Sequence, residues 1–163
     1  MTAPTLHTPV LNDLGRRIAR GELRPGTALT LDAVQARYEV SRTVAREAMR
    51  VLESYHLVAS KRRIGIVVQP AGSWDVLAPD VIHWRLDGGD RVQVLGELTE
   101  LRSAVEPAAA AAAARRAAPA QAERLVALAA RLRKEADDGS SEAFLEADVE
   151  FHTLILESSA NAA

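Results

Sequence analysis

Near the start of the chain, apolar residues recur at three- and four-residue spacing, which is the period of an α-helix. The first stripe consists of Leu11, Leu14 and Ile18. Thr8, followed by Pro9, is expected to cap the start of this helix, and Gly21 is expected to stop it. A second, shorter helix is expected over residues 31–38, with Thr30 as its N-cap.

The helix predicted after Ser41 has two different faces. Its apolar stripe consists of Ala45, Ala48, Met49 and Leu52. On the other face, guanidinium groups four residues apart come from Arg42, Arg46 and Arg50. Thr43 lies beside them, and Ser41 is the expected N-cap. Such a face suits a groove lined by phosphates, and Arg can also bind the O6 and N7 of guanine with two hydrogen bonds. This helix alone leaves a second interpretation open, a solvated face on a small core helix.

The apolar period changes after this helix. Residues 57–60 and 64–68 are short β-prone runs, and Lys61-Arg62-Arg63 lies between them. Two strands with a basic tip, following two short helices and a basic one, are typical of a winged helix-turn-helix. The alternative is a surface hairpin whose charges only keep its edge soluble.

Residues 70–73, Pro-Ala-Gly-Ser, interrupt the pattern and predict a domain boundary. The expected divisions are a winged helix-turn-helix domain over residues 1–72, a linker over residues 73–90 and a helical module over residues 91–163. Both tryptophans, Trp74 and Trp84, lie in the linker. Because large aromatic side chains in a connector are rarely left in water, we expect them to pack across an interface.

The module after the linker is expected to be helical throughout. Pro107 should kink or restart its first helix, and Pro119 should open the next one. Residues 137–140 are expected to form a loop, with Ser141 capping a last helix that ends near Ser158.

Composition agrees with a helical protein. Hydrophobic residues make up 48% of the 163 residues but aromatic residues only 4%, so the core must be aliphatic. The chain has no cysteine, which excludes disulfides and thiolate metal sites and fits a reducing cytoplasm. No apolar run reaches membrane-spanning length, so no membrane partner is expected.

The net charge of −2 hides an asymmetry between the two halves. Residues 1–72 carry 11 Lys and Arg against 6 Asp and Glu, a balance of +5. Residues 73–163 carry 9 against 16, a balance of −7. A basic first half predicts a polyanionic partner, here double-stranded DNA.

The last predicted helix contains one candidate site. Asp148 and His152 are four residues apart, on a face expected to point to the core together with Phe144, Phe151 and Ile155. Two ligands at this spacing can reach one ion, and imidazole with carboxylate suits Zn, Ni, Mn or Fe. A hydrogen-bonded Asp–His pair, or a stripe that rotates outward, explains the spacing equally well.

Several segments of the first module, in one order and spacing, resemble the winged-helix domain of the GntR family of bacterial transcription regulators. They are GELRPGTAL, VSRTVAREAMRVLES, HLV and RRIGIVV, within about residues 8–70. The resemblance implies that Arg42 and Arg46 contact DNA and that Ser41 and Thr43 hold its backbone. It also implies that the wing around Gly65 enters the minor groove. Arg50, Arg62 and Arg63 are expected to add further DNA contacts.

The chain departs from this family pattern at two positions. Asp32 stands where some members have an Arg that contacts DNA, which leaves the operator sequence open. Val44 replaces the usual Pro after Ser-Arg-Thr, a change expected to be neutral.

The segments LTELRSAVEPAAAAAAARRA and EADVEFHTLILESSAN resemble the start of the FCD effector domain, an all-helical bundle in the FadR branch of the family. The resemblance implies that Asp148 and His152 bind a divalent metal, Zn, Ni or Mn, with two further histidines on later helices. It also implies that this metal holds the carboxylate of an effector acid and that Arg102 lies near the pocket. DVLAPDVIHWRL is similar to regulators of sugar-acid catabolism, which indicates a sugar acid as effector.

The sequence stops where such a domain would continue with about three more helices, and no later histidine follows His152. We therefore expect a truncated domain with an incomplete metal site and weak or absent metal binding. Part of its apolar surface should also stay uncovered.

Together these features predict a mainly α protein, in which a winged helix-turn-helix with a small β-hairpin wing precedes an incomplete all-α bundle. The expected function is a cytoplasmic, homodimeric repressor of a metabolic operon, which binds a palindromic operator and responds to a small carboxylic or sugar acid. One alternative is an interaction module whose Ala-rich helices bind a partner. A metal-dependent hydrolase using Asp148 and His152 lacks a nucleophile, a third ligand and a general base, so no enzyme is expected.

Overall fold

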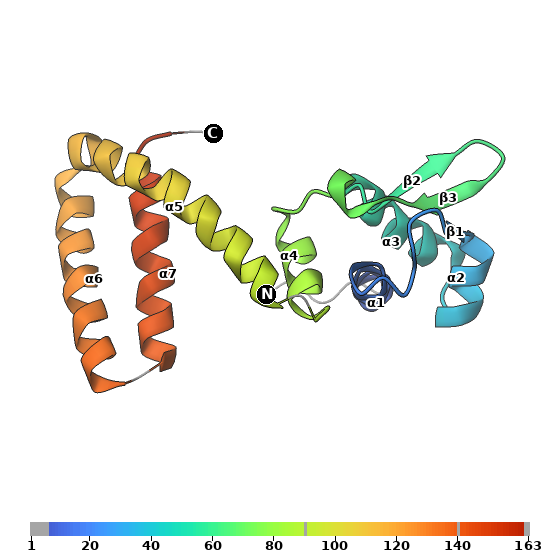
Figure 1. Cartoon of the computed structure of the whole chain (residues 1–163), viewed down its shortest axis with the longest axis horizontal. Helices are drawn as coiled ribbons and strands as arrows, with labels where there is room; N and C mark the ends of the chain where they lie inside the picture. Colours follow the sequence, from blue (N-terminus) through green and yellow to red (C-terminus); the bar gives the residue numbers. More distant parts are fainter. Residues whose placement is uncertain (1–6, 90, 140, 162–163) are drawn as a thin grey trace. The chain divides into compact units, whose positions relative to one another are not determined.

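A computed structural model describes residues 7–89, 91–139 and 141–161, which form two compact units (Figure 1). The first unit runs to Gly96 and the second begins at Glu97. The fold is mainly helical, with one small sheet in the first unit, which confirms the predicted fold class. No described helix is both long and apolar enough to cross a membrane.

The first unit contains all the strands of the described chain. Its elements are α1 (Thr8–Ala19), β1 (Ala28–Leu29), α2 (Leu31–Tyr38), α3 (Arg42–Ser54), β2 (Val58–Lys61), β3 (Gly65–Val68), the 3-10 helix η1 (Ala71–Ser73) and α4 (Pro79–Leu86). The sheet is antiparallel in the order β1-β3-β2. The three predicted helices and the hairpin are therefore confirmed, whereas β1 was not predicted because two residues show no alternation.

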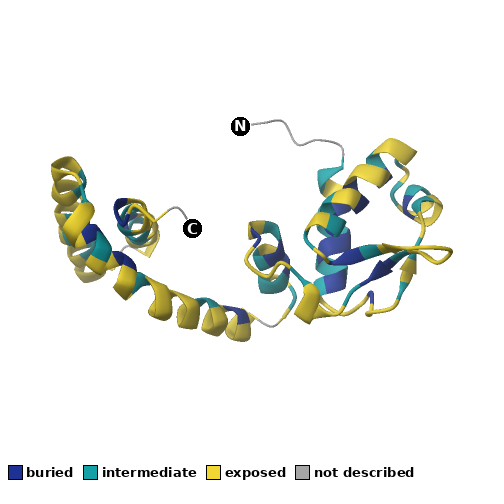
Figure 2. Cartoon of the chain, turned by 90° about the horizontal axis from the view of Figure 1, so that it is seen from above, coloured by how far each residue is buried: buried dark blue, intermediate teal, exposed yellow. Residues whose placement is uncertain are grey.

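The core of the first unit is built from the predicted apolar stripes. Its buried residues include Leu11, Leu14, Ile18, Ala45, Ala48, Met49, Leu52, Val58 and Val68. In Figure 2 these buried residues gather between the helices and the sheet. The helices begin where the caps were expected in two cases: Thr30 Oγ1 accepts from the N–H of Ala33, and Ser41 Oγ from that of Val44. The predicted cap at Thr8 is wrong, because α1 already includes Thr8 and His7 takes the N-cap position.

The segment predicted as a linker contains α4, which packs on α1 within the first unit. Trp84 is 1% exposed, and its Nε1 donates to Asn12 Oδ1 at 3.0 Å. Asp87, just after α4, pairs with Arg16 at 2.9 Å. Trp74 also lies in this unit, where its Nε1 donates to the carbonyl of Gln69. Both tryptophans therefore have partners within the winged-helix unit itself.

Three helices form the rest of the chain: α5 (Arg91–Arg116), α6 (Pro119–Asp138) and α7 (Ser141–Ser158). α6 and α7 form a helical hairpin, joined by ion pairs from Arg124 to Glu150 and from Arg131 to Glu146. Leu128 on α6 is buried, as are other residues of the second unit.

One boundary prediction in this region is wrong and another is only partly correct. Pro107 lies inside α5, which continues past it to Arg116, so the helix does not restart there; a kink remains the expected effect of the missing N–H and of the proline ring. Asp137 and Asp138 belong to the last turn of α6, which ends with Gly139 in the left-handed conformation at φ 71°. That glycine, rather than the two aspartates, ends the helix. Residue 140 of the predicted loop lies outside the described residues.

The core-facing stripe predicted on α7 is only partly correct. Asp148, Phe151 and Ile155 are half-buried, as expected, but Phe144 is 37% exposed. Phe144 lies in the first turn of α7, close to the α6–α7 connection, where it lines a surface hollow with the end of α6.

Candidate functional site

The row of arginines on α3 faces solvent. Arg42, Arg46 and Arg50 are all exposed, and Ser41 and Thr43 at the start of the helix are exposed with them. The opposite face of α3 is buried in the core of the first unit. Because that packing fixes the rotation of α3 about its axis, the arginines must form one continuous polar face.

A tight turn between α2 and α3 orients this face. Glu39, at the C-cap of α2, takes the left-handed conformation at φ 53°, and α3 begins only three residues later. The short connection places the two helices against each other in the helix-turn-helix arrangement.

The three arginines of α3 differ in their partners. Arg42 Nη1 lies 2.8 Å from Asp32 Oδ1 on α2. Arg50 Nη1 lies 4.0 Å from Glu47 Oε2, at the limit of an ion pair. Among the described residues, Arg46 has no ion-pair partner, so its guanidinium remains available to an external anion.

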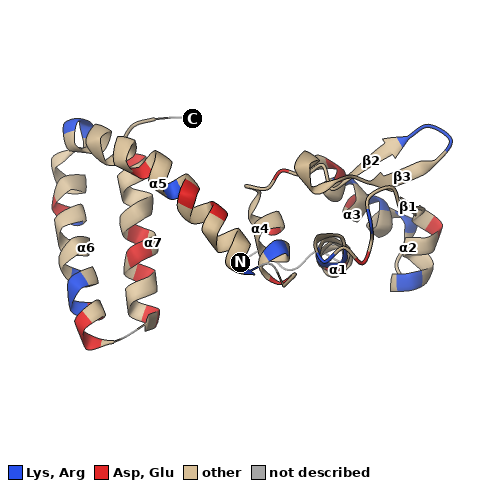
Figure 3. Cartoon of the chain, in the orientation of Figure 1, with Lys and Arg blue, Asp and Glu red and all other residues tan. Residues whose placement is uncertain are grey.

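The β2–β3 hairpin carries a basic, exposed tip, seen in blue in Figure 3. Arg62 and Arg63 lie in the turn, where Arg63 adopts a left-handed φ of 65° and Gly65 a φ of 104°. Ile64 was predicted to begin a strand, but it lies in this turn and is 58% exposed. The turn bends before Gly65 because that glycine accepts the positive φ, and this places an apolar side chain at the basic tip.

In the second unit, Asp148 and His152 belong to a cluster of four charged or titratable side chains. His152 Nε2 lies 3.3 Å from Asp148 Oδ1, and its Nδ1 lies 3.0 Å from Glu106 Oε2. Arg102 Nε donates to Glu106 Oε1 at 2.7 Å, and Arg102 Nη2 is 4.0 Å from Asp148 Oδ2. Sequence reasoning missed Glu106, although its position four residues after Arg102 on one helix was a usable signal.

The cluster supplies only part of a metal site. His152 Nδ1 is buried and forms no hydrogen bond with a described residue, although Glu106 Oε2 lies 3.0 Å away. Such an orphaned nitrogen fits a metal ligand. Within the described ranges, however, no group of three or more His, Cys, Asp or Glu is arranged to hold an ion. Asp148 and His152 therefore offer two ligands and not a closed site.

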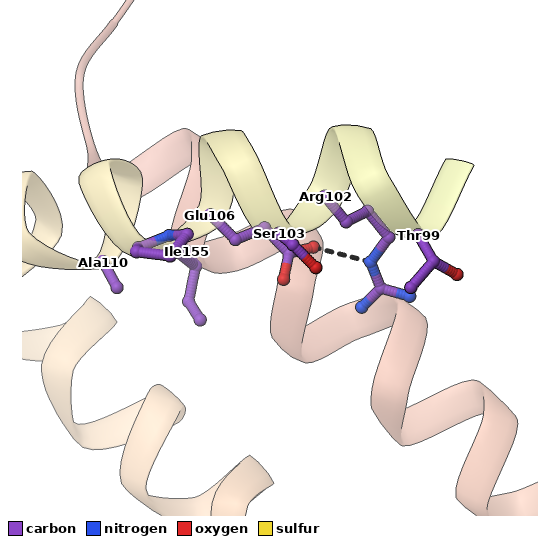
Figure 4. A pocket seen from close by; sticks show the side chains of 7 residues that line it. Thr99, Arg102, Ser103, Glu106, Ala110 and Ile155 are labelled. Atoms are coloured by element: carbon purple, nitrogen blue, oxygen red, sulfur yellow. Dashed lines mark hydrogen bonds and ion pairs between the residues drawn. The ribbon is translucent and has the colours of Figure 1, made fainter. Parts of the chain in front are cut away.

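A cavity of about 420 Å³ opens beside this cluster (Figure 4). It is lined by Thr99, Arg102, Ser103, Glu106, Pro107, Ala110 and Ile155. Arg102 and Glu106 are joined at one part of the wall, while Ala110 and Ile155 make an apolar part. A guanidinium beside hydroxyl groups and a small apolar surface suits a small organic anion.

Two family matches cover most of the chain. Residues 7–68 match the family described as bacterial regulatory proteins, gntR family, and residues 97–163 match the FCD domain. The boundary between the two matches falls in the same region as the boundary between the two compact units.

Two curated relatives from Escherichia coli (strain K12) are transcription regulators. The galactonate operon transcriptional repressor is 33% identical over 147 residues, which are 89% of this chain and 63% of the repressor. The HTH-type transcriptional regulator YieP is 32% identical over 149 residues, 91% of this chain and 65% of that protein. The chain thus spans less than two thirds of either relative.

A solved structure shows the same fold. It comes from a report that Lar controls the expression of the Listeria monocytogenes agr system. It aligns with this chain with a TM-score of 0.57 at 21% sequence identity. The alignment covers 99% of this chain and 67% of that one.

Proposed function

We propose that the chain, which carries a GntR-type winged helix followed by an FCD domain, acts as a DNA-binding repressor of a metabolic operon. The observation that carries this proposal is the row of exposed arginines on α3, on the side of the helix opposite its buried apolar stripe. A solvated helix face would explain the charges on α3, but it would not explain the basic tip of the β2–β3 hairpin in the same unit.

In the proposed complex, α3 lies in the major groove. Arg42 and Arg46 contact guanine edges or phosphates, because their guanidinium groups project from the first turns of the helix. Ser41 and Thr43 donate to the phosphate backbone, and Arg50 adds charge further along. The wing places Arg62 and Arg63 at the neighbouring groove, next to Gly65.

We further propose that the repressor binds as a homodimer to a palindromic operator. One recognition helix reads only a few base pairs, which is too little to define a site in a genome. Two copies related by a two-fold axis double the reading length and impose an inverted repeat.

The proposed effector is a small carboxylic acid, with a sugar acid as the favoured class. The support is the cavity beside Arg102, together with the relative that is named a galactonate operon repressor. Arg102 would hold the carboxylate, and Thr99 and Ser103 offer hydroxyl groups for a polyol.

A divalent metal, Zn, Ni or Mn, is the proposed cofactor of the effector domain. Asp148 and His152 would hold it, and a bound ion would supply positive charge for an acid ligand. Because these residues provide only two ligands, we propose that this chain by itself binds metal weakly.

The proposal is tested by selecting duplexes from a random DNA pool with the full chain. The expected result is enrichment of an inverted repeat, which wild-type protein then binds more tightly than a scrambled duplex. An absence of enrichment, with equal binding of all duplexes, would overturn the proposal and favour an interaction module.

A further inference from the structure

We infer that Asp32 is a positioning residue for specificity: it holds the guanidinium of Arg42 for base contacts and opposes phosphate binding at the same place. This inference rests on the proposed DNA-binding function. The carboxylate, not only the basic residues of α3, then decides which duplex is bound.

The ion pair joins the two helices of the helix-turn-helix. Asp32 is the second residue of α2 and Arg42 is the first of α3, and Oδ1 and Nη1 are 2.8 Å apart. Both backbones are fixed at this point, because α2 and α3 each begin with a side-chain cap, at Thr30 and Ser41. The pair is therefore part of the presented surface rather than a contact between mobile loops.

Stability does not account for this pair. The side chains of Asp32 and Arg42 are 79% and 59% exposed, and exposed ion pairs contribute little to the free energy of unfolding. Asp32 has a favourable place without Arg42, since a carboxylate in the first turn of a helix interacts well with the helix dipole. The consequence of the pair is the orientation of Arg42.

Orientation matters for a guanidinium because its five donors lie in one plane. The contact with Asp32 occupies a donor of Nη1 and leaves the other N–H groups for a base. A side chain already held in one conformation loses less entropy when it forms a two-bond contact with guanine. Of the three arginines on α3, only Arg42 is held by a short ion pair with a described residue.

The charge of Asp32 has a second effect. A carboxylate beside Arg42 cancels much of the attraction between that guanidinium and any phosphate, which is the sequence-independent part of DNA binding. Base contacts made by the remaining N–H groups are kept. Asp32 therefore lowers the affinity for every duplex but lowers it least for the correct one.

The test compares Asp32→Asn with Asp32→Glu and with Glu39→Gln in the full chain. Glu39→Gln is the matched control, because Glu39 is also an exposed acidic residue of the helix-turn-helix, at the C-cap of α2, but forms no ion pair with a described residue. Fluorescence anisotropy measures binding to the duplex enriched by the wild type and to a scrambled duplex, at two salt concentrations.

Asp32→Asn is expected to bind the scrambled duplex more tightly and to lower the ratio of the two affinities about fivefold or more. Asp32→Glu should retain most of the ratio, and Glu39→Gln should change both affinities alike. In an Arg42→Ala background, Asp32→Asn should leave the ratio unchanged.

An unchanged ratio in Asp32→Asn, equal to that of Glu39→Gln, would overturn the inference. Failure of the underlying function looks different, because the wild type itself would then show no preference between the duplexes. Thermal unfolding of each variant shows that the comparison is made between folded proteins.

Discussion

The ring of Trp84 occupies the space that a side chain at Gly15 would need: a Cβ there would lie 2.3 Å from Trp84 Cδ2. Gly15 on α1 thus forms a notch into which α4 docks. Because Trp84 also donates to Asn12, the docking is directional as well as apolar. This relationship makes α4 part of the winged-helix unit, although the sequence between the two modules reads as a linker.

Gly15→Ala should therefore destabilise the first unit. Overpacking a close contact costs about 1–3 kcal/mol, and the backbone and the large rigid indole leave little room for adjustment. Urea unfolding followed by circular dichroism measures the effect. Gly96→Ala is the control, because Gly96 lies in α5 with nothing within 4 Å of its would-be Cβ. It should be stabilising, and equal effects of both changes would contradict the notch.

Lys61→Ala in the wing should weaken binding to all duplexes alike. Lys61 ends β2 beside the basic tip, where a phosphate contact would release counterions. The slope of log affinity against log salt should fall by about 1, with the preference between duplexes unchanged. Lys134→Ala, on the exposed side of α6, removes the same charge outside the winged helix and should leave the slope as it was. A loss of sequence preference in Lys61→Ala would instead mean that this residue reads bases.

Alkaline pH should destabilise the first unit. Burial raises the pKa of Tyr55, and its hydrogen bond to Asp80 raises it further; burial and a hydrogen bond to Asp13 raise the pKa of Tyr38 in the same way. A raised pKa means that the folded state holds the proton more tightly than the unfolded state does. The resulting stability is fully present below the unfolded pKa of about 10 and is lost as pH rises through the folded pKa.

Urea midpoints measured between neutral pH and pH 11.5 or so would show this loss. In the double variant Tyr38→Phe/Tyr55→Phe, the decline above pH 10 or so should be smaller, because no phenol remains to ionise at either place. An equally steep decline in the double variant would assign it to other groups.

Metal retention should be far below one ion per chain after dialysis against metal-free buffer. The reason is that Asp148 and His152 provide two ligands, and two ligands do not close a site. Elemental analysis after loading with Zn²⁺ or Ni²⁺ measures it, with His152→Ala for comparison. One ion retained per wild-type chain and lost in His152→Ala would contradict this expectation.

The spacing of apolar residues predicted the helices of the winged helix well, because each of these helices buries one apolar face. The stripe from Leu11 to Ile18 and the stripe from Ala45 to Leu52 are regular enough to place α1 and α3. The two residues of β1 carry no such signal, since they pair with Ile66 and Val67 far along the chain.

The features of the two sites that the sequence did not predict depend on tertiary contacts or on local backbone conformation. Glu106 and His152 are 46 positions apart, and their 3.0 Å approach depends on how α5 meets α7, which no local pattern encodes. Ile64 was assigned to a strand because of its β propensity, but the positive φ of Gly65 keeps it in the turn. The pair of Asp32 and Arg42 could be guessed from opposite charges, but not its distance.

Arg46→Ala tests whether α3 binds DNA in a sequence-specific way. Arg46 is exposed on α3 and has no ion-pair partner among the described residues, so its loss leaves no carboxylate unpaired in that part of the chain. Fluorescence anisotropy would compare the wild type, Arg46→Ala and Arg133→Ala, whose arginine lies on α6, on the enriched and the scrambled duplex. We predict that Arg46→Ala loses about 1–3 kcal/mol at the enriched duplex and much less at the scrambled one, with Arg133→Ala unchanged. Undiminished affinity and preference in Arg46→Ala would contradict the assignment of α3 as the recognition helix.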